Sequence, residues 1–407
     1  LIFGWGELTI RLPGAIFGIL IILAIYFFTL RLFNNQKIAI LASFFTAITP
    51  FEIFFSRKSF ENVAGIFFML VGFTLLLTYL QNKSKTMWLY GGVFILAIAS
   101  YTYFSHAIII PLMLILFFLI YRESLVNKSG IRAGLFWLVL ILPLIFLVLT
   151  NSDVRYRSQK VFITKDVNLG ERMQNTKTFD PILDYLLEKK AVFDFSFNRF
   201  LAQFDPIYVF GNGLDFTNQG YLGVGPLMIV QLPFVILGIL YLIGVKEKSR
   251  EKKFILVWVA LGMLPSGLTF EPTSPHRSIM VFTMFIIICA AGLTLFFSKY
   301  ANWYLKIFVS LAIFVNFIYF IHMYAINFPH EKFQHLHYPF EQVSKFMWSE
   351  YDNFDQIVFD PLYGQSAPII GTAAHYYVGY FGNYPPSKMQ KEYRLGEKER
   401  EVLFDKF

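Results

Sequence analysis

Charged residues and cysteine are both scarce in this sequence. Only 15% of its 407 residues are charged, whereas a soluble protein carries about 25%. Its single cysteine, Cys289, lies inside an apolar run, so an internal disulfide and a cysteine metal cluster are both excluded. We expect Cys289 to be a packed core residue.

The motifs of several soluble enzyme classes are missing as well. The sequence has no Gly-rich phosphate loop, no HExxH and no Ser–His–Asp spacing. No nucleotide cofactor is therefore expected, and the donor of any transferase would come from the bilayer. The chain begins at Leu1-Ile2-Phe3, without methionine or a signal peptide, which we interpret as a fragment lacking its N-terminus.

Long apolar runs dominate what is present, since 56% of the residues are hydrophobic and 49 are phenylalanine. A helix needs about 20 apolar residues to cross a bilayer, and it satisfies its own backbone hydrogen bonds there. The pattern predicts an all-α polytopic membrane protein with about ten transmembrane helices. The predicted spans are 12–33, 38–55, 60–80, 88–104, 107–121, 133–150, 226–245, 254–270, 278–297 and 303–324.

The formal net charge of +8 could indicate a nucleic-acid partner, but the positions of the charges argue against it. Basic residues gather in alternate connections between spans, which is typical of cytoplasmic loops. These clusters are Arg31 and Lys37; Lys83 and Lys85; Arg122, Lys128 and Arg132; Lys246, Lys248, Arg250, Lys252 and Lys253; and Lys299. The connections 56–59, 105–106, 151–225, 271–277 and 325–407 then face outward from a plasma membrane. Membrane lipids are the expected surroundings.

Four parts follow from this topology. They are a first bundle of six spans (1–150), an extracytoplasmic loop (151–225), a second bundle of four spans (226–324) and an extracytoplasmic C-terminal domain (325–407). Asp180 is typical of an N-cap and predicts a helix inside the loop. A helix over 340–351 and a strand over 356–360 predict a small α/β C-terminal region.

The short connection after the second predicted span carries basic residues, although basic residues are typical of the cytoplasmic side and this connection is predicted to face outward. Arg57 and Lys58 are basic on the predicted outer side, and Glu61 follows Arg57 by one helical turn. Either a basic side chain meets an anionic head group while Glu61 orients a metal or a hydroxyl, or the charges form an interfacial ion pair. Both interpretations stay open.

A second short connection, Pro275-His276-Arg277, directly precedes a predicted span. Helix N-termini and arginine side chains both bind phosphate. The alternative is a rigid turn whose Arg277 reaches lipid head groups. We favour the phosphate site.

Two further groups are weaker candidates. Tyr103 and His106 either line a cavity or belong to an interfacial aromatic belt. Arg155 and Arg157, just beyond the span 133–150, could reach a lipid phosphate.

Five segments resemble, in order, a known family. Residues 7–18 resemble an "RLPSALFG" span start, and residues 50–62 resemble an "SP…SR…EN" stretch. Residues 100–105 resemble "YTYFS", residues 204–213 resemble "F-S-P-x-F-L-F-x-x-GD", and Pro275-His276-Arg277 resembles a "PHR" loop. The family is the family 39 glycosyltransferases of the GT-C fold, which includes protein O-mannosyltransferases and the lipid A aminoarabinose transferase. The tail after Asp355 resembles prokaryotic members.

The resemblance implies a transfer reaction at the outer face. A polyprenyl-phosphate sugar would enter from the bilayer, and a hydroxyl or amine of a protein, lipid or glycan acceptor would attack it. By resemblance, Arg277, with Arg57 or Arg157, would bind the donor phosphate, and Glu61 would support the donor or a divalent metal. The remaining pocket residues would be Asn62, Tyr103, His106 and His276.

The sequence also departs from the family. The family's acidic motif precedes the "RLPSALFG" span, so the general base is expected upstream of residue 1. Asn212-Gly213-Leu214-Asp215 replaces the usual "GD". A transporter or flippase of lipid-linked sugars is the alternative, and a binding-only relative is a third. Transporters usually carry polar groups near the midplane, whereas the unusual charges here gather at one face, which favours a transferase. The resemblance implies a hexosyl- or pentosyltransferase.

Overall fold

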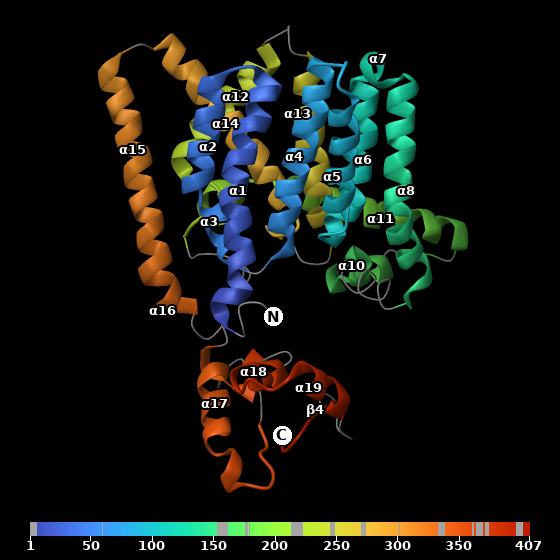
Figure 1. Cartoon of the computed structure of the whole chain (residues 1–407), viewed down its shortest axis with the longest axis vertical. Helices are drawn as coiled ribbons and strands as arrows, with labels where there is room; N and C mark the ends of the chain where they lie inside the picture. The colour runs from blue at the N-terminus through green and yellow to red at the C-terminus, as the bar shows by residue number, and fades with distance from the viewer. Residues whose placement is uncertain are drawn as a thin grey trace. The chain divides into compact units, whose positions relative to one another are not determined.

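A computed structural model describes most of the chain (Figure 1). The described residues are 6–58, 60–152, 162–175, 178, 180–212, 223–244, 249–269, 274–300, 302–332, 338–359, 362–363, 369–370, 374–395 and 402–407. Contacts divide the chain into a unit formed by Glu7–Ile321 and a second unit that includes His322–Phe407. The predicted boundaries at 150, 225 and 324 stay a prediction.

The first unit is built of helices. They are α1 (Glu7–Phe33), α2 (Gln36–Ile48), α3 (Pro50–Arg57), α4 (Glu61–Gln81), α5 (Thr86–Ser100), α6 (Phe104–Ile120), α7 (Arg122–Leu125), α8 (Lys128–Thr150), η1 (Ile163–Lys165), α10 (Val167–Asn175), α11 (Pro181–Ala202), η2 (Ile207–Asn212), η3 (Ile229–Gln231), α12 (Leu232–Gly244), α13 (Ser249–Gly267), α14 (Ile279–Lys299) and α15 (Trp303–His322). Asp180 caps α11 as predicted, because its carboxylate accepts hydrogen bonds from the backbone N–H groups of Ile182 and Leu183.

The chain is a multi-pass membrane protein, as predicted. Within the described residues, α1, α4, α8, α14 and the stretch Trp303–His330 are long and apolar enough to cross a membrane, and α2 with α3 forms a bent pair that could be a sixth crossing. The apolar helices α5, α6 and Ile229–Gly244 are shorter. With α13, whose first turns are charged, these helices occupy all ten predicted spans.

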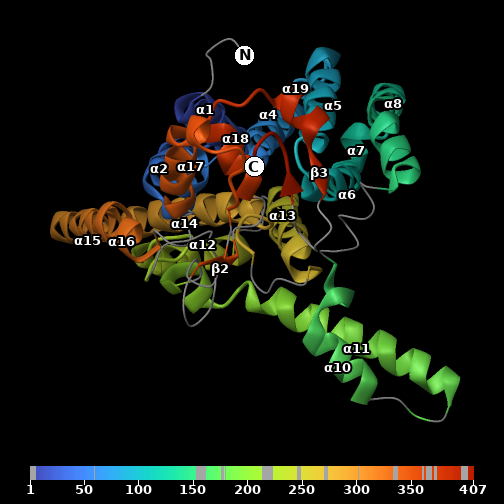
Figure 2. The same cartoon turned by 90° about the horizontal axis from the view of Figure 1, so that it is seen from below.

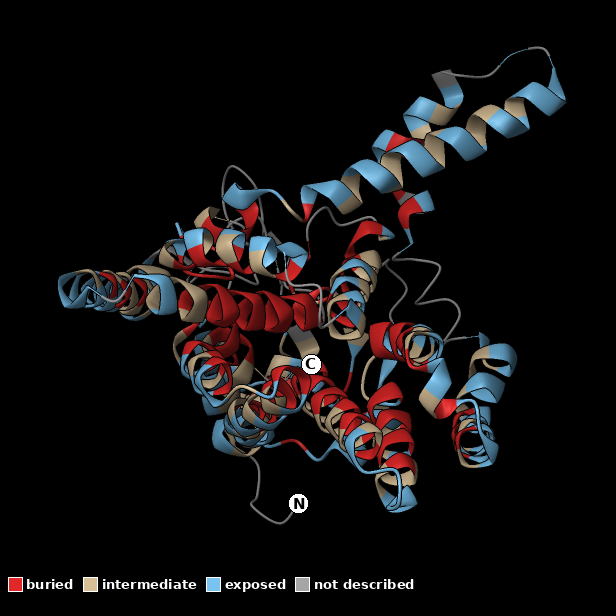
Figure 3. Ribbon diagram, turned by 90° about the horizontal axis from the view of Figure 1, so that it is seen from above, coloured by how far each residue is buried: buried red, intermediate tan, exposed pale blue. Residues whose placement is uncertain are grey.

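The centre of this unit is α14. Its residues from Ile279 to Leu293 are all buried, and Figure 3 shows this helix in red among partly exposed neighbours. A helix that is apolar on all sides is expected in such a place. It lies very close to α12: a Cβ atom at Gly292 would lie 2.0 Å from the carbonyl oxygen of Phe234. Cys289 is fully buried here, which confirms its predicted role in the core.

Two predicted boundaries are wrong. The span 38–55 is not one helix, since α2 and α3 meet at an angle of 56°; Pro50, which has no backbone N–H, opens α3 after the break. The connection predicted at 105–106 lies at 101–103 instead. Ser105 and His106 are buried in the first turn of α6, because their side chains are packed inside the bundle.

Within the first unit, the described parts of the two sets of predicted connections lie at opposite ends of the bundle. At one end, the Arg31 guanidinium donates to the Gln81 side chain over 3.0 Å. At that end too, α7 is tied to the start of α13 by an ion pair between Glu123 and Arg250. Figure 1 places α7 at the opposite end from α10. We call these the predicted cytoplasmic end and the predicted outer end.

The second unit combines helices with two short antiparallel strand pairs. Its elements are η4 (Met323–Asn327), α16 (Phe328–Lys332), α17 (Tyr338–Ser349), η5 (Tyr351–Asn353), β1 (Leu362–Tyr363), β2 (Ile369–Ile370), α18 (Ala374–Phe381), α19 (Pro386–Glu392), β3 (Arg394–Leu395) and β4 (Val402–Leu403). β1 pairs with β2 and β3 with β4. The predicted helix 340–351 is confirmed as α17, whose Phe340, Ser344 and Met347 are buried on one face.

The strand predicted over 356–360 is wrong for residues 356–359, and Asp360 lies outside the described residues. The N–H of Ile357 donates to the carbonyl oxygen of Lys406 over 2.9 Å, but this single bond starts no ladder. The apolar side chains of Ile357 and Phe359 pack instead against a small core that includes Met347 and Phe404. The apolar residues of this stretch therefore belong to a packed loop.

Candidate functional site

The turn before α14 is held in place by the end of α13. The Ser266 hydroxyl accepts a hydrogen bond from the backbone N–H of Ser274 over 2.7 Å. The Ser274 carbonyl oxygen in turn accepts from the N–H groups of Arg277 and Ser278, over 3.0 and 3.3 Å. The turn is therefore tied to α13, and it presents His276 and Arg277 at the beginning of α14.

His276 is the centre of the contacts at this turn. Its carbonyl oxygen accepts a 2.7 Å hydrogen bond from the side-chain amide of Asn62. Its ring stacks on Phe60 at 6.1 Å between centroids, and Tyr103 meets it edge-on at 6.4 Å. Its Nδ1 lies 3.0 Å from the Ser274 hydroxyl. Three chain segments that are far apart in the sequence therefore meet at one imidazole.

Two positive side chains act on His276. Burial, together with the charges of Arg277 and Lys58, lowers the pKa of His276 to about 3, so the ring is neutral at physiological pH. Burial also lowers the pKa of Lys58 to about 8. The ammonium group of Lys58 lies 4.0 Å from the centre of the Phe54 ring. Arg277 is only 9% exposed.

We call Lys58, Phe60, Asn62, Tyr103, His276 and Arg277 the His276 cluster. The positive charges of Arg277 and Lys58 both act on the His276 ring, and two cations near one group favour an anion there. Arginine adds a planar fork that matches two phosphate oxygens, and lysine adds a point charge. The cluster is therefore suited to bind an anionic group such as phosphate.

His106 lies next to the cluster without sharing its polar contacts. Its ring meets Tyr103 edge-on at 6.0 Å and is fully buried. Within the described part of the chain, neither ring nitrogen has a hydrogen-bond partner. A Cβ atom at Gly65 would lie 2.9 Å from the ring. Gly65 thus leaves the space that His106 fills behind Tyr103.

The other predicted residues are placed differently. Arg57 is the last residue of α3, and it is exposed. The charge of the next residue, Lys58, lowers the pKa of His276. Glu61 is exposed at the first residue of α4. Arg155, Arg157 and Asp215 lie outside the described residues. The structure thus brings together Asn62, Tyr103, His276 and Arg277, with His106 beside them.

Sequence reasoning missed Glu52, a buried carboxylate in α3. Glu52 is 5% exposed, and its Oε1 has no hydrogen-bond partner among the described residues. A Cβ atom at Gly18 of α1 would lie 3.6 Å from that oxygen. The signal was a carboxylate inside the predicted span 38–55, since ionisable residues at membrane depth are usually functional.

A divalent metal does not fit the described residues alone. None of their His, Cys, Asp and Glu side chains form a group of three that could hold an ion. Glu61 is therefore no metal site without further ligands, and the predicted metal stays a prediction.

A pocket of about 510 Å³ lies elsewhere, in the second unit. Tyrosines dominate its lining, among them Tyr376, Tyr380, Tyr384 and Tyr393. It contains no residue that the sequence predicted as part of a site.

The fold has counterparts among known proteins. A family model described as dolichyl-phosphate-mannose-protein mannosyltransferase matches residues 1–147. That range includes Asn62, Tyr103 and His106 but not His276 or Arg277. Among curated proteins, none matches this chain.

Solved structures of an Archaeoglobus fulgidus oligosaccharyltransferase are similar across most of the chain. The form tethered with an acceptor peptide containing the NVT sequon is 15% identical, with a TM-score of 0.51 over 92% of this chain and 52% of that one. The archaeal oligosaccharyltransferase AglB in complex with an inhibitory peptide and a dolichol-phosphate is 14% identical, with a TM-score of 0.51 over 92% and 53%. The complex with Zn and sulfate is 14% identical, with a TM-score of 0.50 over 92% and 50%.

The chain spans about half the length of these structures. At such low identity the likeness shows the fold alone. The resemblance to a GT-C glycosyltransferase is thereby confirmed for the fold, and the family model agrees over the first 147 residues. The assignment to family 39 in particular stays a prediction.

Proposed function

We propose that this chain is part of a membrane glycosyltransferase that moves a sugar from a polyprenyl-phosphate donor to an acceptor at the extracytoplasmic face of a prokaryotic plasma membrane. The observation that carries the proposal is the His276 cluster, which places Arg277 and Lys58 around a neutral imidazole at the predicted outer end of a GT-C-like bundle. The AglB structure with bound dolichol-phosphate supports a lipid-phosphate donor.

The donor phosphate is the part of the substrate that the cluster would recognise. Arg277 would bind two phosphate oxygens, and Lys58 would add a second positive charge. Both electrostatic interactions become stronger as negative charge develops on the leaving phosphate. Arg57 and Arg157 remain further candidates for this role. The donor would reach the cluster sideways from the bilayer, as a lipid-linked group must.

The transfer itself is a substitution at the anomeric carbon. The acceptor hydroxyl or amine forms a bond to that carbon while the bond from the carbon to the phosphate oxygen breaks. The electron pair leaves with the polyprenyl phosphate, and the acceptor proton passes to a general base. We assign this base to no described residue.

The neutral residues of the cluster would shape the pocket. Asn62 fixes the backbone at His276, and the Phe60 and Tyr103 rings hold the imidazole from two sides. A neutral His276 can donate or accept a hydrogen bond without adding charge. Glu61, exposed at the start of α4, would contact the sugar hydroxyls of the donor or a metal.

A transporter or flippase of lipid-linked sugars is the second candidate. Buried Glu52 favours it, because transporters often place ionisable groups at membrane depth. The His276 cluster favours the transferase, since its charges gather at one end of the bundle. Protein, lipid and glycan acceptors remain open, as do hexosyl and pentosyl donors.

The test uses the full-length protein in lipid nanodiscs. A panel of polyprenyl-phosphate sugars is supplied with and without candidate acceptors, and the release of polyprenyl phosphate is measured. We expect release from one donor class, which also identifies the sugar.

The matched variants are Arg277→Ala and Arg250→Ala. Arg250 is an arginine at the predicted cytoplasmic end, so its loss should leave release unchanged. Folded protein that releases nothing from any donor would favour the transporter or a binding-only relative.

A further inference from the structure

The helix α11 leaves the bundle sideways. Figure 1 shows it running across the direction of the bundle helices, and Figure 2 shows it reaching beyond them. It runs from Pro181 to Ala202, and none of its residues is buried. Within the described part of the chain, every side chain of α11 therefore stays at least partly exposed.

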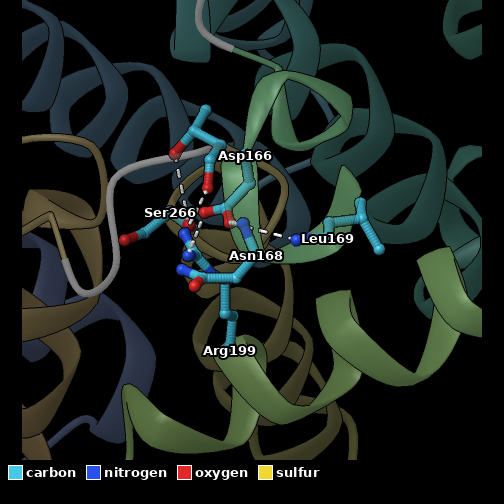
Figure 4. Close-up of polar contacts among 6 residues, drawn as sticks. Asp166, Asn168, Leu169, Arg199 and Ser266 are labelled. Carbon is cyan, nitrogen blue, oxygen red and sulfur yellow. Dashed lines mark hydrogen bonds and ion pairs between the residues drawn. The ribbon is translucent and has the colours of Figure 1, made fainter. Parts of the chain in front are cut away.

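An ion pair anchors its C-terminal end to the bundle. The Arg199 guanidinium pairs with the Asp166 carboxylate, which also caps the start of α10 by accepting from Asn168 and Leu169 (Figure 4). Arg199 also donates to the carbonyl oxygen of Thr269, just beyond α13, over 3.1 Å. The helix α11, which we call the arm, is therefore fixed by its C-terminal end at the predicted outer end.

Large apolar side chains lie along one side of α11. Ile182, Leu186, Phe193 and Phe197 are between 48% and 74% exposed. At about 100° per residue they fall within an arc of roughly 60°. Phe193 and Phe197 stack on each other at 5.9 Å. We call these four side chains the apolar arc.

The apolar arc faces away from α10. The side of α11 that α10 covers is marked by Phe195, whose ring lies 5.4 Å from the Arg172 guanidinium of α10. Phe195 lies about 170° around the helix from the middle of the arc. In Figure 1, α10 lies lower than α11, on the side away from the middle of the bundle. The arc is therefore turned toward the level that lipid occupies around the bundle.

Apolar side chains are also exposed on α13, the bundle helix that contacts α11. A Cβ atom at Gly267 of α13 would lie 3.3 Å from Phe200 of α11. Leu256 of α13 and Leu268, just beyond it, are 57% and 37% exposed. Phenylalanine stacks and lysines are typical of helices that lie in a membrane interface. Lys190, at the edge of the arc, can extend its amine to water while its stem stays in lipid.

We propose that α11 lies in the lipid–water interface of the bilayer, with the apolar arc of Ile182, Leu186, Phe193 and Phe197 in contact with lipid. The arm would then be an in-plane membrane anchor, held to the end of α13 by Arg199 and Asp166. It would fix the depth in the bilayer of the turn that carries His276.

The experiment places nitroxide labels on the full-length protein in nanodiscs, with Cys289→Ala as background. One label replaces Phe193 in the arc, and the control replaces Asn198, which is exposed on another side of the same helix. Collision of each label with oxygen, which partitions into lipid, is compared with collision with a water-soluble nickel chelate. We expect oxygen to dominate at position 193 and nickel to dominate at position 198.

Two results would overturn the proposal. If nickel dominates at both positions, α11 stands in water. If the label at 193 is immobilised and shielded from both reagents, a protein partner covers the arc. Both labelled proteins must elute as the unlabelled protein does, and a label at Phe197 replaces one at Phe193 if that variant does not fold.

Discussion

Two arginines near the end of α13 differ in the charges around them. Arg199 pairs with the carboxylate of Asp166, and the two side chains are only 12% and 7% exposed. Arg277 is similarly buried and lies beside His276. The positive charges of Arg277 and Lys58 both lower the pKa of that imidazole. The first place joins opposite charges in one ion pair, whereas in the second two positive charges act on one imidazole.

The difference separates structural from functional use of a buried charge. An ion pair that is satisfied by the protein holds two elements together, as Arg199 holds the arm to α13. Two positive charges that act on one imidazole lower its pKa, and groups with perturbed pKa values are concentrated at functional sites. The comparison therefore predicts that losing Arg199 loosens structure, whereas losing Arg277 weakens ligand use.

The largest effect should follow Arg199→Ala. Removing one partner leaves the buried Asp166 carboxylate uncompensated, which costs roughly 3–5 kcal/mol. We expect faster hydrogen exchange over 162–203 in the full-length protein. Replacing both partners, as Asp166→Leu with Arg199→Met, should restore much of the protection. Equal exchange in wild type and Arg199→Ala would contradict a structural role for this pair.

The next effect concerns Arg277→Ala. The loss of a desolvated phosphate contact should weaken donor use by roughly 2–5 kcal/mol. Turnover of the donor is the measurement, with hydrogen exchange over 162–203 expected to be unchanged. Arg277→Lys should recover part of the loss, because lysine keeps the charge but not the fork. Normal turnover by Arg277→Ala would remove the role assigned to this residue.

A smaller effect is expected from Gly65→Ala. The added Cβ would lie 2.5 Å from the Thr102 hydroxyl and 2.9 Å from the His106 ring, so both must move. Overpacking of this kind costs roughly 1–3 kcal/mol. We expect a lower midpoint of thermal unfolding, with no change of charge in the His276 cluster. Gly134→Ala is the control, since nothing lies within 4 Å of a Cβ there.

The smallest effect is a pH dependence set by Lys58. Its pKa is lowered to about 8, so its charge is present below that pH and lost above it. The kcat/KM for the donor, which reports the free enzyme, should fall roughly tenfold between pH 7 and pH 9. Lys58→Arg, whose charge persists, should flatten this decline. His276, with a pKa of about 3, should add no change in this range.

The sequence predicted the elements of the fold better than their meeting points. Apolar runs of membrane length located all ten helical regions, and Asp180 located the start of α11. Local signals sufficed there, because a helix depends on its own residues. The bend of 56° between α2 and α3 was not predicted, since Pro50 permits a straight entry into a helix as readily as a break.

The site was predictable only in part, because its residues meet across the bundle. Asn62 and His276 are 214 positions apart, and no local pattern joins them. The turn at His276 and Arg277 was nevertheless found from its place before an apolar span. Glu52 was missed because its burial depends on the close approach of α1 at Gly18. Sequence analysis thus located charges but not the partners that decide their roles.

The most direct test of the account is phosphorus NMR of polyprenyl phosphate in nanodiscs containing the full-length protein. We predict that the phosphate resonance shifts or broadens with wild type and with Arg250→Ala, and that it returns to the free-lipid signal with Arg277→Ala. An unchanged resonance with folded wild type, or the same change with Arg277→Ala, would contradict a lipid-phosphate site at the His276 cluster.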